Sequence, residues 1–225
     1  RVSGKLPELW NPLTAEIRYL PEFACSGEVT TVPVRLEGYE SSFLIFRKKG
    51  SPKKTAARNY PHKEVLATVA SPWQVAFEKG KRGPSETVTF PELKDWTTSA
   101  DASIRYFSGK AVYTNRITLP ELPQKPLYLD LGKVMVMAKV KVNGQYAGGV
   151  WTMPYRLPVG EYLVEGENLI EVEVVNNWMN RLIGDSLLPE QERGTWTNVN
   201  PWKSDSPLQS SGLIGPVEIQ AYSYE

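Results

Sequence analysis

The sequence contains 225 residues, 41% of them hydrophobic, which allows a sizeable core in one large domain or about one and a half ordinary ones. The net charge is +1, with 26 basic against 25 acidic side chains, which gives no support for nucleic-acid binding. The single cysteine, Cys25, excludes an intramolecular disulfide and a cysteine-based zinc site, and no apolar run is long enough to span a membrane.

The chain opens with Arg1 and has neither an initiator methionine nor a signal peptide. We therefore expect a fragment or a processed piece of a longer protein. Its first part, residues 1–47, has the composition of short strands, expected at 16–20, 28–36 and 42–46. The third is almost wholly apolar, which predicts a central position. Three strands cannot close a core alone, so this part is expected to be the tail of a β-sandwich.

Residues 48–70 are predicted to form a linker, because the segment begins rich in lysine, contains Gly50 and Pro52, and shows no periodicity. The only histidine, His62, falls in this segment. A metal site or a Ser-His-Asp triad would depend on this one residue, and an exposed linker histidine is the favoured interpretation.

Residues 71–225 contain roughly eight strands with turn signals between them, and no convincing amphipathic helix. This pattern predicts an antiparallel β-sandwich of the jelly-roll type, so the fold class of the whole chain is all-β. The clearest element is a hairpin at 134–151 with Asn143-Gly144 at its turn, since a type I′ turn needs φ > 0 at both central positions. Such a turn would pair Val142 with Gln145, Lys141 with Tyr146 and Val140 with Ala147.

Two carboxylates on the strand at 169–174, Glu171 and Glu173, point to the same side of the sheet. Paired carboxylates are the tools of glycoside hydrolysis, but Lys139 and Lys141 have the same spacing on the hairpin. The favoured interpretation is therefore a solvated face of opposite charges on neighbouring strands.

A polar and aromatic loop is predicted at 176–200, directly after this strand. Aromatic faces that pack on sugar rings, and amide, carboxylate and guanidinium groups that bind hydroxyls, are typical of carbohydrate sites. The favoured interpretation is that Trp178 and Trp196 are buried by a neighbouring domain and that Arg181 pairs with Asp185, with sugar contact as the alternative. The candidates for carbohydrate binding or domain docking in this loop are Trp178, Asn180, Arg181, Asp185 and Trp196.

Tryptophans near strand ends are a second source of candidates. Trp73 is expected in the core, whereas Trp151 follows Gly148-Gly149 and precedes Pro154-Tyr155, which makes Trp151 and Tyr155 the better ligand candidates. The turn Gly80-Lys81-Arg82-Gly83 opens no helix, so it is not a phosphate loop.

Several motifs together resemble the sugar-binding, galactose-binding-like jelly roll attached to family 2-type glycoside hydrolases: Tyr106 to Tyr113, Leu129-Asp130-Leu131-Gly132, Val142-Asn143-Gly144 and Gly166-Glu167-Asn168-Leu169. The run Asn177-Trp178-Met179-Asn180-Arg181-Leu182-Ile183-Gly184-Asp185, followed by Thr195-Trp196-Thr197 and Ser211 to Val217, is similar to the C-terminal end of bacterial α-L-rhamnosidases of glycoside hydrolase family 106. The early segment, residues 9–47, resembles the β domain before that jelly roll.

The resemblance implies an accessory part of a periplasmic or secreted rhamnosidase that degrades plant polysaccharide. In such enzymes the acidic catalytic pair and a nearby calcium ion belong to a preceding (β/α) barrel, and this chain has no βα repeats, so no catalytic residue is assigned here. The expected partners are carbohydrate and that barrel; no cofactor is assigned, and a structural calcium ion stays open. A stand-alone carbohydrate-binding module and a purely structural brace between domains are the alternatives.

Overall fold

The computed structural model describes residues 2–53, 57–70 and 72–224. It is built almost entirely of antiparallel strands, which confirms the all-β fold class. The chain divides into two compact units, Arg1–Glu64 with Ala221–Glu225, and Val65–Gln220. Over the described ranges, no helix is both long and apolar enough to cross a membrane.

The smaller unit contains a three-stranded sheet in the order β2 (Ile17–Tyr19), β1 (Glu8–Trp10), β5 (Phe43–Ile45), and a hairpin of β3 (Ala24–Ser26) and β4 (Val29–Thr31). The prediction of a central third strand is wrong: β5 is an edge strand, and Phe43 is 60% exposed. Strands this short carry too little pattern to tell an edge from a centre, because either position can hold apolar side chains. The strand expected at 28–36 is shorter, since Pro33 has no N–H to donate to a neighbour.

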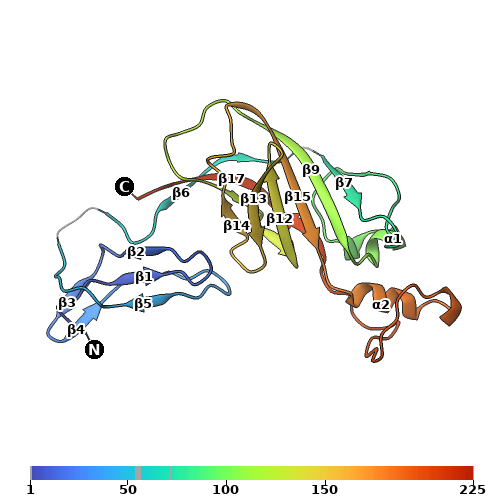
Figure 1. Cartoon of the computed structure of the whole chain (residues 1–225), viewed down its shortest axis with the longest axis horizontal. Coiled ribbons are helices and arrows are strands. Elements are labelled where there is room, and N and C mark those ends of the chain that lie inside the picture. Colours follow the sequence, from blue (N-terminus) through green and yellow to red (C-terminus); the bar gives the residue numbers. More distant parts are fainter. Residues whose placement is uncertain (1, 54–56, 71, 225) are drawn as a thin grey trace. The chain divides into compact units, whose positions relative to one another are not determined.

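The larger unit is organised around a six-stranded sheet in the order β13-β12-β15-β9-β7-β8. Its two long central strands, β9 (Lys110–Leu119) and β15 (Gly166–Val175), pair along ten residues each (Figure 1). Alternate side chains of both strands are buried, as the period of two predicts. The other members are β7 (Trp73–Phe77), β8 (Val88–Phe90), β12 (Met137–Val142) and β13 (Gln145–Val150).

A second sheet has the order β14-β10-β17-β6, and its apolar side chains complete the β-sandwich. Its strands are β14 (Arg156–Pro158), β10 (Leu127–Asp130), β17 (Glu218–Ser223) and β6 (His62–Thr68), and β11 (Lys133–Met135) pairs separately with β16 (Gly212–Gly215). The segment expected to be a linker thus contains a strand, β6, which includes His62. Its exposed side chains do not alternate clearly, which is why no periodicity marked it in the sequence.

The β12–β13 hairpin has the predicted turn, with φ of 52° at Asn143 and 79° at Gly144. Val142 pairs with Gln145 and Lys141 with Tyr146 as predicted, but Val140 pairs with Gly148 instead of Ala147. A β-bulge causes this shift, and Gly148 tolerates the backbone required there, with φ of 137°.

The charged ladder expected beside the hairpin is present. Lys139 lies opposite Glu173 and Lys141 opposite Glu171, and the Lys139 Nζ–Glu173 Oε1 distance is 3.9 Å. The two glutamates therefore belong to a solvated face of the sheet.

One end of the sandwich core is aromatic. The Trp96 indole N–H donates to the Tyr113 hydroxyl at 2.6 Å, and the same oxygen accepts the Leu213 N–H at 3.2 Å. Trp73 is buried here, as predicted, against Tyr113 in an edge-to-face contact. The cluster consists of Trp73, Phe77, Phe90, Trp96, Phe107 and Tyr113.

The described residues include two α-helices, α1 (Ala102–Arg105) and α2 (Met179–Ser186), and two short 3-10 turns, η1 (Trp96–Thr98) and η2 (Glu190–Glu192). The expectation of no amphipathic helix is wrong at α2, which occupies part of the predicted loop. Polar residues form most of its buried face, so no apolar stripe at helical spacing revealed it.

Candidate functional site

Residues 176–211, which we call the α2 arm, carry most of the predicted site residues. The arm starts where β15 ends, and α2 lies beyond that end of the strand (Figure 1). Trp178 precedes the helix, and the Asn177 side-chain oxygen accepts the Met179 N–H at 3.2 Å. This bond supports the first turn of the helix directly after β15, where the N-cap residue Trp178 makes no capping bond with its own side chain.

The helix buries one face against the rest of the larger unit. Asn180, Arg181, Ile183, Gly184 and Asp185 are the buried residues. Gly184 permits the close approach, since a Cβ there would lie 2.7 Å from the Cβ of Tyr106. The Arg181 N–H donates to the Ser108 hydroxyl at 3.2 Å, which ties the helix to the segment before β9.

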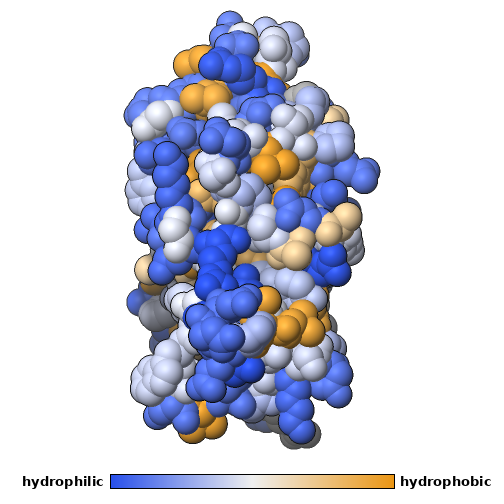
Figure 2. Space-filling view, turned by 90° about the vertical axis from the view of Figure 1, so that its right-hand side faces the viewer, coloured by the Kyte–Doolittle hydropathy of each residue, from blue (hydrophilic) through white to orange (hydrophobic). Residues whose placement is uncertain are grey.

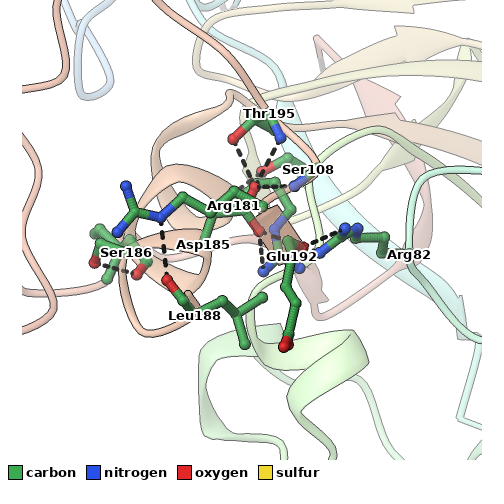
Figure 3. A network of polar contacts seen from close by, with 11 residues as sticks. Arg82, Ser108, Arg181, Asp185, Ser186, Leu188, Glu192 and Thr195 are labelled. Atoms are coloured by element: carbon green, nitrogen blue, oxygen red, sulfur yellow. Dashed lines mark hydrogen bonds and ion pairs between the residues drawn. The ribbon is translucent and has the colours of Figure 1, made fainter. Parts of the chain in front are cut away.

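Asp185 is the centre of a polar network (Figure 3). One carboxylate oxygen, Oδ2, accepts the backbone N–H groups of Gly194 and Thr195 at 3.0 and 2.9 Å, and the Thr195 hydroxyl at 2.7 Å. The other, Oδ1, lies 2.7 Å from Arg181 Nη2 and 3.6 Å from Arg82 Nη1. We call these contacts the Asp185 clasp, because they hold residues 194–195 against the end of α2.

The electrostatics of the clasp favour the ionised carboxylate. Burial alone would raise the pKa of Asp185, but hydrogen bonds from Thr195 and Gly194 and the charge of Arg181 outweigh it, so the pKa lies below its ordinary value. The Asp185 carboxylate is therefore ionised in the folded chain at neutral pH.

This lowered pKa predicts an acid-dependent stability. In the unfolded chain Asp185 titrates near pH ~3.9, so above about pH 5 both states are ionised and the stabilisation is complete. As the pH falls through the unfolded value, the unfolded state takes up the proton first and the stabilisation declines. We expect the difference in free energy of unfolding between wild type and Asp185→Asn to shrink between pH 5 and pH 3, measured by urea denaturation; a difference independent of pH would contradict the assignment.

A second set of contacts fixes the far end of the arm. The Asn180 amide donates to the Gln209 carbonyl at 2.7 Å and to the Ser211 hydroxyl at 3.1 Å, and its oxygen accepts the Gln209 N–H at 2.8 Å. Asp95 accepts the Ser211 N–H at 3.0 Å. Both ends of the arm are thus held by side chains that bond within the chain.

The tryptophan candidates have a different environment from these polar ones. Trp196 is 88% exposed, Trp151 is 61% exposed and Trp178 is 53% exposed. Trp196 directly follows the clasped residues, and the Lys81 ammonium lies 5.3 Å from the centre of the Trp178 ring. Exposed indoles of this size can offer ring faces to a ligand or a partner domain.

The structure therefore brings together five of the seven predicted residues on the α2 arm. Asn180, Arg181 and Asp185 are buried and bonded within the chain, and the Arg181–Asp185 pair of the favoured interpretation is present. Trp178 and Trp196 project from the same arm. Trp151 follows β13, and Tyr155 is buried, its backbone oxygen accepting the Leu131 N–H at 2.9 Å.

Sequence reasoning missed Lys81 and Arg82 as members of this site. The two glycines that flank them were a signal for a tight turn, but no local pattern relates this turn to residues 178–196. The turn meets the arm through contacts between segments that are far apart in the sequence. One of them is the 2.6 Å hydrogen bond from Arg82 Nη2 to the Glu192 carbonyl, 110 residues away.

The face of the molecule at the right of Figure 1, shown in Figure 2, is mostly hydrophilic, with hydrophobic residues in small separate groups. A broad apolar interface would show instead one large, continuous hydrophobic patch. Across the described ranges, no group of three or more histidine, cysteine or acidic residues could hold a metal ion.

Comparison with known proteins identifies glycoside hydrolases as relatives. No protein-family model matches the sequence. A protein of Formosa agariphila named "Putative beta-glucuronidase" is 35% identical, over 76% of this chain and 16% of its own length.

The solved structure of a rhamnosidase from Novosphingobium sp. PP1Y is 39% identical and matches 98% of this chain, with a TM-score of 0.84. A β-glucuronidase from Ruminococcus gnavus shares the fold over 72% of the chain, with a TM-score of 0.51 and 18% identity. The chain spans 16% of the first relative, 21% of the rhamnosidase and 29% of the latter enzyme. It is thus similar to a β domain associated with much larger glycoside hydrolases.

Proposed function

We propose that this chain is an accessory, non-catalytic portion of a larger glycoside hydrolase. The parent enzyme would be an α-L-rhamnosidase of the glycoside hydrolase family 106 type. One observation carries the proposal: nearly the whole chain, 98%, matches a fifth of a rhamnosidase at 39% identity. An enzyme of this kind that degrades plant polysaccharide would act in the periplasm or outside the cell.

Within that protein, we assign residues 71–225 to a galactose-binding-like jelly roll and residues 1–47 to the end of a preceding β-sandwich. The antiparallel six-stranded sheet and its four-stranded partner support the first assignment. The three-stranded sheet β2-β1-β5, with exposed apolar side chains such as Phe43 and Ile17, supports the second.

We assign saccharide contact to the α2 arm, with Trp178 and Trp196 as the ring-stacking residues and Asn180, Arg181 and Asp185 as the residues that hold the arm in place. Trp151, which is exposed, and Tyr155, which is buried, are kept as further candidates for saccharide contact. The exposure of the tryptophans favours contact with a ligand. The buried ion pair between Arg181 and Asp185 indicates that these polar residues stabilise the arm and do not contact the ligand.

A stand-alone carbohydrate-binding module is the second candidate, because the three exposed tryptophans need no other domain to meet a glycan. A purely structural brace would instead present a flat apolar patch to a catalytic barrel. The mostly hydrophilic surface in Figure 2 favours binding over bracing on that face.

The absence of catalysis can be tested directly on the purified chain. We expect no release of p-nitrophenol from an aryl α-L-rhamnoside or an aryl β-glucuronide above the rate of a heat-denatured control, because the matched segment is a fifth of the rhamnosidase. Turnover at about 1 s⁻¹ or faster, a rate typical of enzymes, would overturn the non-catalytic assignment.

A further inference from the structure

The turn Gly80–Gly83, between β7 and β8, touches the α2 arm on both sides of the helix. Lys81 lies against Trp178, before the helix, and Arg82 lies against residues 192–194, after it. The turn therefore brings two cationic side chains to the arm, one at Trp178 and one at residues 192–194, which end two positions before Trp196.

This turn is seated firmly on the core. A Cβ on Gly83 would lie 2.7 Å from ring atoms of Phe107 and 3.0 Å from the Cβ of Phe77, so only glycine fits. Arg82 has a φ of 61°, a conformation that is uncommon for a residue with a side chain. Its guanidinium packs on Gly194, where a Cβ would lie 2.4 Å from Nε. The strained backbone is retained by these contacts, which direct Arg82 onto the arm.

The charge of the turn is only partly compensated. Asp185 is shared by two guanidinium groups, with the buried Arg181 closer at 2.7 Å and the half-exposed Arg82 at 3.6 Å. Among the interactions of the described residues, the Lys81 ammonium has the Trp178 ring and no ion pair with a carboxylate. An anionic group that arrived at the turn would meet one unpaired cation and one partly paired cation.

From this juxtaposition we infer that the turn and the arm form a subsite for an acidic saccharide unit. Trp178 and Trp196 would pack on sugar rings, and Lys81 and Arg82 would bind a carboxylate or sulfate carried by the sugar. Asp185 is a positioning residue, since it fixes the backbone of Gly194 and Thr195 immediately before Trp196. This inference rests on the proposed saccharide-binding function and adds the class of its ligand.

The test uses the 225-residue chain and three oligosaccharide probes of equal length: an oligogalacturonate, a sulfated carrageenan oligosaccharide and a neutral galactan oligosaccharide. Isothermal titration calorimetry should give at least about tenfold tighter binding of an acidic probe than of the neutral one, because each charge-assisted contact is stronger than a neutral one. Preference for the uronate or for the sulfate identifies the anionic group, and either supports the subsite.

Variants locate the binding. Lys81→Gln should weaken the preferred acidic probe about tenfold and the neutral probe much less, whereas Trp196→Ala should weaken both to a similar extent. Lys141→Gln is the matched control, since it removes the same charge from the outer face of β12, opposite Glu171. Equal affinity for acidic and neutral probes, or equal losses in Lys81→Gln and Lys141→Gln, would overturn the acidic subsite while leaving saccharide binding intact.

A chain that binds none of the three probes would overturn the subsite as well. The non-catalytic assignment depends on the hydrolysis assay and not on binding. Failure of the subsite is therefore seen in the calorimetry, and failure of the non-catalytic assignment in the hydrolysis assay. Arg82→Gln serves as an additional variant, with its thermal unfolding recorded so that loss of the turn is separated from loss of the charge.

Discussion

Replacing Asp185 by alanine should destabilise the larger unit by about 3–5 kcal/mol, the largest effect we expect from a change in the α2 arm. The substitution leaves the buried Arg181 guanidinium without its carboxylate, and breaking a buried pair in this way costs about that amount. It also removes the acceptor of three hydrogen bonds to Gly194 and Thr195. Urea denaturation followed by intrinsic tryptophan fluorescence, to which the buried Trp73 and Trp96 contribute, measures the loss.

Two further variants show whether the clasp acts as a unit. Arg181→Ala should cost less than Asp185→Ala, because the carboxylate keeps Arg82 and its three hydrogen bonds. The double variant should be little less stable than Asp185→Ala alone, since the two residues share one interaction. Asp205→Ala, an exposed change in the same arm, is the control and should stay within about 0.5 kcal/mol of wild type. Strictly additive losses would show that Arg181 and Asp185 stabilise the arm independently.

Replacing Gly132 by alanine should destabilise the sandwich by about 3 kcal/mol or more. A Cβ there would lie 2.4 Å from the carbonyl carbon of Gly215 and 2.5 Å from its oxygen, so backbone would have to move. The φ of 61° at Gly132 adds a smaller cost, roughly 1–2 kcal/mol. The segment at residue 132 can pack on the end of β16 only because Gly132 has no side chain.

Gly144→Ala separates the two contributions. Gly144 also has a positive φ, 79°, but a Cβ there would meet nothing within 4 Å. This control should lose only the conformational part, roughly 1–2 kcal/mol, in the same urea experiment. Similar losses in both variants would mean that the close approach of Gly132 to Gly215 is not present in solution.

The features that the sequence predicted best are those set by neighbours along the chain. The Asn143-Gly144 turn, the alternation of β9 and β15, and the opposed lysine and glutamate pairs all follow from a period of two and from turn chemistry. The bulge at Ala147–Gly148 interrupts the register in a way that a strict alternation cannot show.

The arrangement of the candidate site could not be predicted in the same way. Asp95 and Ser211 are separated by 116 residues, and Arg82 meets Glu192 and Asp185 only because the sandwich brings the β7–β8 turn to the arm. The buried face of α2 is mostly polar, so its residues resembled ligand-binding groups until their partners within the chain were visible. The exposure of Trp178 and Trp196 likewise depends on tertiary packing.

If the α2 arm is a saccharide-binding edge of a non-catalytic domain, the purified chain should bind oligosaccharides released from a rhamnose-containing plant polysaccharide. Calorimetric titration of the chain with these oligosaccharides measures that binding. We expect saturable binding by the wild type, and a loss of about tenfold or more in Trp196→Ala, whose indole is exposed and therefore not needed for the core. No measurable binding by the folded wild type, or unchanged binding by Trp196→Ala, would contradict a saccharide-binding role of the α2 arm.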